Sequence, residues 1–170
     1  MVGIRQMFSV EKAVEVLLYI AKEVPDTYRA LKILYLADKE HLARYGRLIC
    51  GDSYVAMKLG PVPSGVYDIV KHIRGDGFCW TDVPITEAFV VEGYNITPLR
   101  DPNLELLSES DVECLDTVIK KCGHLPFEAL KQLSHDDAYA SSDLNDFIPL
   151  EAIAKTLPDS DLLVDYIQDS

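Results

Sequence analysis

The densest group of side chains that could do chemistry is His135-Asp136-Asp137, an imidazole followed by two carboxylates. These residue types can transfer protons or bind a metal ion. One hypothesis is a metal-assisted hydrolase that uses His135 and Asp136 together with Asp38 or His41. The structural alternative is that His135 ends a helix, where the dipole favours an imidazolium, and that the aspartates cap the next helix. We favour this alternative because no nucleophile and no glycine-rich oxyanion element accompanies the cluster.

Asp38-Lys39-Glu40-His41 is a second charged group, within a stretch of helical periodicity. Asp38 and His41 lie three residues apart and can share one helix face. As metal ligands they would need a third partner. The pattern therefore favours a solvated or ion-paired helix face over a metal site.

The four cysteines, at positions 50, 79, 114 and 122, show no CxxC spacing, so neither a zinc pair nor a redox pair is indicated. We expect reduced thiols, most of them buried. A metal site assembled from Cys79, His72 and His135 is the less favoured alternative. No phosphate-binding glycine loop is present either, and no cofactor or metal is predicted.

Helices must position these side chains, because apolar residues recur at three- and four-residue steps along most of the chain. Residues 89–99 are rich in β-formers around a central glycine and predict a small hairpin that packs on the helices. Residues 47–59 predict a loop and then a short helical or extended piece, which Gly60-Pro61-Val62-Pro63 ends. The expected helices, with their capping or ending residues, are 10–24 (Ser9, Pro25), 27–45 (Asp26 or Thr27, Gly46), 64–74 (Ser64, Gly75), one from Ser108 or Ser110 to 122 (Gly123), 126–134, one that Pro149 begins, and 159–167.

The predicted fold class is therefore mainly α, a compact helical domain with a small β-hairpin. A length of 170 residues with 48% hydrophobic composition fits one core, so we expect one domain over residues 1–170. No secretory signal and no run of about 20 apolar residues is found. We expect a soluble, cytoplasmic protein.

The formal net charge of -12 is unevenly distributed. Residues 1–85 carry 11 lysines and arginines against 10 aspartates and glutamates, whereas residues 86–170 carry 5 against 18. Such an acidic half repels phosphate and attracts basic partners, so direct nucleic-acid binding is not expected. The alternative is that these carboxylates serve solubility alone.

Several tyrosines lie where an apolar core would not require them, namely Tyr35, Tyr45, Tyr54 and Tyr67. Tyrosine combines a large apolar ring with a polar end, which makes it a frequent contact residue at interfaces. For each one taken singly, core packing with a bonded hydroxyl is the favoured role.

Residues 31–77 carry a more specific pattern. Leu31-Lys32-Ile33-Leu34-Tyr35-Leu36-Ala37-Asp38 is followed by Gly46-Arg47-Leu48-Ile49 and then by Tyr54-Val55-Ala56-Met57-Lys58-Leu59-Gly60-Pro61-Val62 and Tyr67. In order and spacing this set resembles the Panacea domain, the SocA-like antitoxin domain of bacteria and phages. Leu133-Ser134-His135 with Asp136 and Tyr139 is similar to a later segment of that family, and Phe147-Ile148-Pro149 with Ile153 resembles its closing helix.

The resemblance implies a mainly helical fold and a protein that is not an enzyme but neutralises a cognate toxin by direct binding. It leaves open a proteolytic adaptor that delivers the toxin to a protease, and it leaves homodimer formation open. We expect no additional DNA-binding helix-turn-helix domain of the kind that some relatives carry. The acidic half fits a basic toxin. Candidate partner-binding residues are Tyr35, Asp38, Tyr54, Gly60, Pro61, Tyr67 and His135, although Gly60, Pro61 and Tyr35 are favoured as structural.

Overall fold

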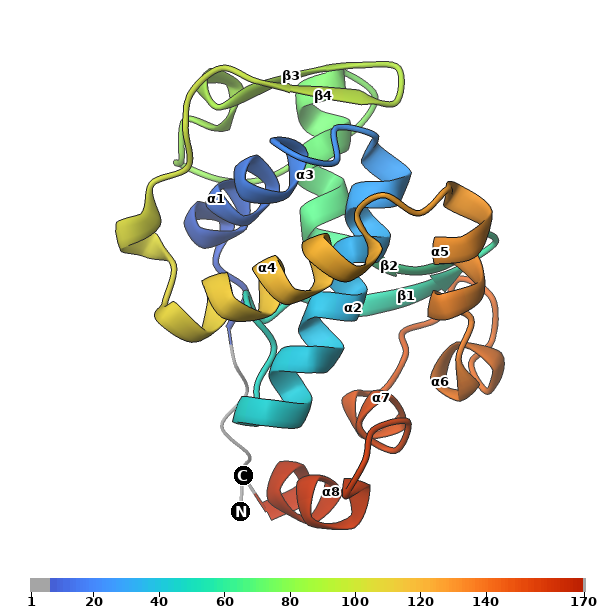
Figure 1. Ribbon diagram of the computed structural model, residues 1–170. Helices are drawn as coiled ribbons and strands as arrows, with labels where there is room; N and C mark the ends of the chain where they lie inside the picture. Colours follow the sequence, from blue (N-terminus) through green and yellow to red (C-terminus); the bar gives the residue numbers. More distant parts are fainter. Residues whose placement is uncertain (1–6, 170) are drawn as a thin grey trace.

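The computed structural model describes residues 7–169. Their helices and strands are arranged around one long helix, α2 (Thr27–Tyr45) (Figure 1). Asp26 begins this helix, since its side chain accepts a hydrogen bond of 2.9 Å from the Arg29 N–H. Gly46 ends it in the left-handed region, at φ 77°. Both ends are therefore fixed by local residues, as the sequence predicts.

Within residues 7–169, seven other helices and two 3-10 turns accompany α2, and mainly α is confirmed as the fold class. The predicted caps Ser9 and Ser108 are confirmed by their hydrogen bonds. Ser64 is the first residue of its helix rather than the cap, which is Pro63. The elements are α1 (Val10–Ala21), α3 (Ser64–Arg74), η1 (Ile85–Glu87), η2 (Leu104–Leu106), α4 (Glu109–Cys122), α5 (Phe127–Ser134), α6 (Asp137–Ala140), α7 (Leu150–Ala154) and α8 (Ser160–Asp169).

The predicted hairpin is present as β3 (Phe89–Glu92) and β4 (Asn95–Pro98), which pair antiparallel. A second hairpin, β1 (Tyr54–Met57) with β2 (Gly60–Pro63), occupies the segment where the sequence predicts no defined pairing. The edge of β1 that faces away from β2 forms hydrogen bonds with a later segment, in which the Ala56 N–H donates to the Asp146 carbonyl at 2.9 Å. The two prolines therefore sit on an outer strand, where a missing N–H is tolerated.

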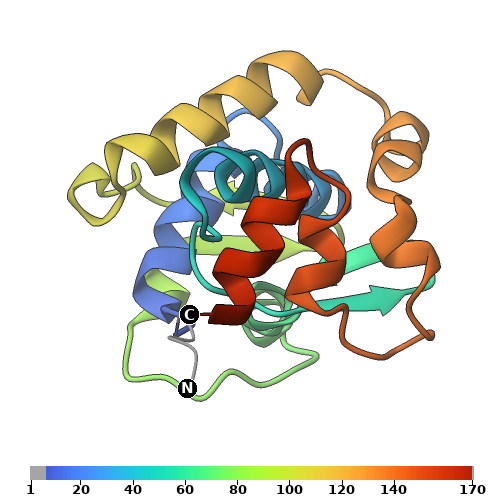
Figure 2. The ribbon, with the colours of Figure 1, turned by 90° about the horizontal axis from the view of Figure 1, so that it is seen from below.

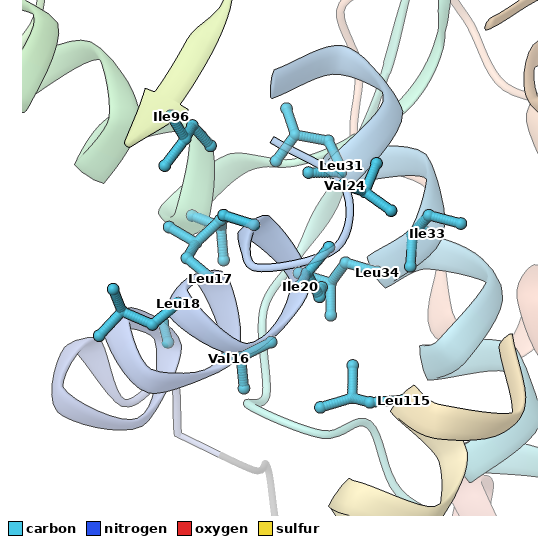
Figure 3. Packing of buried hydrophobic residues seen from close by; sticks show 14 of the residues in the cluster. Val16, Leu17, Leu18, Ile20, Val24, Leu31, Ile33, Leu34, Ile96 and Leu115 are labelled. Carbon is cyan, nitrogen blue, oxygen red and sulfur yellow. The ribbon is translucent and has the colours of Figure 1, made fainter. Parts of the chain in front are cut away.

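The larger apolar cluster lies between α1, α2, α3 and the β3–β4 hairpin, with α4 along one side. Figure 3 shows Leu17, Leu34, Ile96 and Leu115 meeting there from four different elements. Each such fully buried side chain contributes about 1.5–3 kcal/mol. Of the cysteines, three are buried, one is half-buried, and all four are free thiols.

A smaller apolar cluster lies beside the second half of α2 and includes Tyr35, Tyr54, Ile148 and Ile153. Helices α7 and α8, which lie side by side in Figure 2, cover this cluster. None of the helices within residues 7–169 combines the length and the apolar character needed to cross a bilayer.

Helix α3 is capped from a distance, because Pro63 offers no side-chain acceptor. The buried Asp52 carboxylate accepts hydrogen bonds from the N–H groups of Gly65 and Val66, at 2.9 and 2.8 Å. Burial raises the pKa of Asp52, although these bonds favour its charged form. Asp52 thus ties the start of α3 to the loop that precedes β1.

Replacing Asp52 with alanine should lower the free energy of unfolding by about 1–2 kcal/mol, because two helix N–H groups lose their acceptor. Urea denaturation of the purified protein measures this loss. Ser53→Ala, at the exposed neighbouring position, is the control and should leave the midpoint unchanged. Equal midpoints for both variants would show that Asp52 is not the cap.

Candidate functional site

Asp38 lies at the centre of a buried polar network between α2 and β1, with 1% of its surface exposed. Its two carboxylate oxygens accept hydrogen bonds from the Ile49 N–H at 2.7 Å and the Tyr54 hydroxyl at 2.6 Å. Burial raises the pKa of Asp38 to about 7, and the carboxylates of Asp52 and Asp111 add to the rise against the effect of the two bonds. One side chain of α2 thereby holds the loop after α2 and the first strand.

The prediction of a solvated face is wrong for Asp38 and His41, because both are buried. Burial lowers the pKa of His41, so its ring is neutral. Its Nδ1–H donates to the Arg47 carbonyl, and Nε2 accepts from the Ser110 hydroxyl, both at 2.8 Å. His41 therefore joins α2 to α4. Lys39 and Glu40 do lie on the partly exposed, ion-paired face that the sequence predicts.

The network continues from Tyr54 to α6. The Tyr54 and Tyr35 rings meet edge to face with centroids 4.9 Å apart. The Tyr35 hydroxyl donates to Asp136 Oδ2 at 2.6 Å, and Lys39 Nζ lies 2.8 Å from the same oxygen. Asp136 Oδ1 accepts from the Tyr139 N–H at 3.0 Å and caps α6. The expected capping role of Asp136 is confirmed.

Gly60 forms the second contact between α2, the β1–β2 hairpin and α5. Its φ is +126°, and a Cβ there would lie 2.7 Å from Lys32 Nζ and 3.2 Å from Ser134 Oγ. Lys32 is almost fully buried and donates to the Leu59 carbonyl at 2.6 Å. Burial lowers the pKa of Lys32 to about 8. Glycine is needed here because the turn, the lysine and the end of α5 meet in one place.

His135 follows Ser134 as the C-cap of α5, as the structural interpretation predicts. Its ring is exposed and stacks on Tyr139 with centroids 4.3 Å apart. The Tyr139 hydroxyl donates to the Met57 carbonyl at 2.6 Å. The histidine thus covers the outer side of the hairpin contact.

The structure brings most of the candidate contact residues together but turns them inward. His135 is exposed, and Tyr67 is half-buried on α3 with Lys71 Nζ 4.8 Å from its ring centre. As Tyr67 packs on the larger apolar cluster, it is not part of the network. The buried candidates are Tyr35, Asp38, Tyr54, Gly60 and Pro61.

The side chains proposed for chemistry are occupied by structural bonds. Asp38, His41 and Asp136 each bind a different neighbour, and His72 accepts from the Cys79 N–H at 3.2 Å. Within residues 7–169, no three His, Cys, Asp or Glu side chains are grouped so that they could hold a metal ion. The arrangement joins secondary-structure elements through these side chains.

The sequence analysis missed the role of Lys32. The signal lay in its spacing, since Lys32, Tyr35 and Lys39 recur at three and four residues on one face of α2. A cation on the same face as core residues indicates a buried polar contact. Its acceptor, the Leu59 carbonyl, could not be identified before the hairpin was known.

The family model described as "Antitoxin SocA-like, Panacea domain" matches residues 31–140. This range contains the whole network from Lys32 to Tyr139 and leaves α7 and α8 outside. Neither a curated protein nor a solved structure matches the chain. The matched motif residues are therefore, in this structure, the residues that hold α2, the β1–β2 hairpin, α5 and α6 together.

The raised pKa of Asp38 predicts a specific pH dependence. In the unfolded chain this carboxyl ionises near pH 4, whereas in the folded protein it keeps its proton up to about pH 7. Its stabilising contribution is therefore complete below about pH 4 and is lost as the pH rises to about 7.

Asp38→Asn removes this titration. The stability of the wild type relative to the variant should fall by roughly 2–4 kcal/mol between pH 4 and pH 7 and then stay level. Chemical denaturation at a series of pH values measures the difference. A difference that does not change with pH would show that Asp38 titrates normally.

Gly60→Ala should lower stability by about 2–4 kcal/mol, because alanine is strained at this φ and its methyl group displaces Lys32 from Leu59. Gly93→Ala is the matched control, with φ +60° and no atom within 4 Å of the added methyl group. It should lose only about 1 kcal/mol. Equal losses in thermal or urea unfolding would refute the close packing at Gly60.

Proposed function

Because the chain belongs to the SocA-like, Panacea-domain antitoxin family, we propose that it neutralises a cognate toxin by binding that toxin directly. The family gives an antitoxin role in general. The match over residues 31–140 is the observation that carries the proposal, since it covers the complete buried network.

The bonding of the polar side chains supports a binding protein over an enzyme. Asp136, the most enzyme-like carboxylate in the sequence, accepts from Tyr35 and Tyr139 and pairs with Lys39. A general base needs a free acceptor oriented toward a substrate. In this proposal the buried motif residues hold the helices and the β1–β2 hairpin in fixed positions, and exposed residues around them contact the toxin.

The charge distribution supports a basic toxin as the partner. Residues 135–169 alone carry nine aspartates and glutamates and one lysine. Such a surface accelerates encounter with a basic protein and repels the phosphates of nucleic acid. We propose a cytoplasmic protein–protein complex without direct nucleic-acid contact.

Co-expression with the protein encoded by the adjacent reading frame tests the proposal. The chain should restore growth, and the two purified proteins should form a complex of fixed stoichiometry by size-exclusion chromatography with light scattering. Toxin levels on an immunoblot should stay unchanged during rescue. Rescue that requires a cellular protease and lowers the toxin level would indicate the adaptor role instead.

His135→Ala separates binding from catalysis, because this ring belongs to the most enzyme-like cluster of the sequence and is exposed. We expect rescue to persist, with the dissociation constant raised by less than about tenfold. A variant that still forms the complex but no longer neutralises the toxin would point to catalysis and contradict the proposal.

A further inference from the structure

A groove of about 580 Å³ lies between the C-terminal end of α2 and helix α8. Tyr45 and Gly46 line it from the α2 side, and Leu162 and Tyr166 line it from α8. A Cβ on Gly46 would lie 3.3 Å from the Tyr166 ring. The tyrosine therefore packs directly over the left-handed glycine that ends α2, and this contact sets one end of the groove.

The apolar side chains of this groove are strongly exposed. Leu162 is 78% exposed, Tyr166 is 59% exposed and Tyr45 is 45% exposed. Leu162 and Tyr166 are four residues apart and so share one face of α8. Exposed large apolar residues grouped on one face are typical of an interaction site.

Helix α8 has apolar residues on two faces. Leu163, Val164 and Ile167 are partly buried against the smaller cluster, yet no residue of α8 is fully buried. A helix with a single docking surface keeps its outer face polar. The second apolar face, with Leu162 and Tyr166, is therefore unexplained by the fold of this chain.

One carboxylate, Asp159, lines the groove, and Asp161, Asp165 and Asp169 are exposed on α8 beside it. Arg44 packs on the Tyr45 ring, with its guanidinium 5.6 Å from the ring centre, and it is bonded to Glu113 and lies 3.7 Å from Glu40. Among residues 7–169, no lysine or arginine lines the groove itself.

A second groove extends this surface along α4. It has a volume of about 510 Å³ and is lined by Leu107 and Val112 together with Glu109, Glu113 and Asp116. The Tyr45 hydroxyl donates to Glu113 at 2.8 Å, which joins the two grooves. Both grooves thus combine apolar residues with carboxylates, of which Glu113 is paired with Arg44. Of the described residues that line the second groove, none is a lysine or arginine.

The charges decide between possible occupants. A second copy of the chain, docked symmetrically, would bring the same acidic edges face to face. Nucleic acid and anionic membranes would be repelled for the same reason. A protein segment with apolar anchors flanked by lysines or arginines satisfies both the groove and its edges.

We propose that the surface formed by α8, Tyr45 and the acidic face of α4 is where the toxin docks, through a basic segment with apolar anchors. This inference rests on the proposed antitoxin function. Tyr45 and α4 lie within the matched residues 31–140, whereas α8 lies outside them, so the α8 part of this surface can vary while the buried network stays the same. The C-terminal segment then sets which toxin is recognised.

The test uses the full chain and the protein encoded by the adjacent reading frame, with calorimetry as the readout. The double variant Leu162→Ala/Tyr166→Ala should raise the dissociation constant at least tenfold, since it removes exposed anchors and keeps good helix formers. Phe78→Ala/Trp80→Ala is the matched control, because these side chains are 65% and 88% exposed elsewhere. It should leave the constant within about threefold of wild type.

Two double variants that reverse charges provide an independent test of the docking surface. Asp165→Lys/Asp169→Lys should slow association and weaken its salt dependence more than Glu87→Lys/Glu92→Lys, which changes the net charge equally at exposed positions near the β3–β4 hairpin. Stopped-flow kinetics at two ionic strengths measures both. Equal effects would mean that net charge alone matters and would overturn the proposed site.

The outcomes separate the two proposals. If wild type fails to bind and to rescue growth, the antitoxin function itself fails. If wild type binds and Leu162→Ala/Tyr166→Ala binds equally well, the function stands and the docking surface is wrong. If that variant changes only the oligomeric state, the groove is an interface between copies, and the inference is also overturned.

Discussion

The hydrogen bond between Asp38 and Tyr54 is the interaction on which the rest of this structure depends. It places a carboxyl group in the interior, where the charged form is disfavoured, and it joins α2 to β1. From Tyr54 the contact passes to Tyr35 and then to Asp136. Removing one member of such a chain leaves buried polar groups without partners, which is costly.

This arrangement links the motif to the surface that we propose for recognition. The Tyr35 and Tyr54 rings belong to the same apolar cluster that Leu163 and Ile167 of α8 cover. Tyr35 and Tyr54, which lie in the matched range, therefore belong to the cluster on which α8 packs. A protein built in this way can keep its interior while its C-terminal face diverges, which is what recognition of different toxins would require.

Local signals made much of the fold predictable. The caps Ser9, Asp26 and Ser108 and the ending residue Gly46 depend on neighbours within four residues, so the sequence shows them directly. The β1–β2 hairpin was not predictable, because the prolines of β2 resemble a break and the strand depends on pairing with distant residues. The same difference between nearby and distant contacts applies to the candidate site. The resemblance marked several residues that the buried network joins, but the burial of Asp38 depends on Ile49 and Tyr54, which no periodicity brings together.

Hydrogen exchange of the chain, alone and in complex with the protein encoded next to it, tests the central claim most directly. If the buried network supports a recognition face, the amides of residues 160–169 should exchange more slowly in the complex, while those of residues 75–84, around the exposed Phe78 and Trp80, should not change. Protection confined to residues 75–84, with none at α8, would contradict the account.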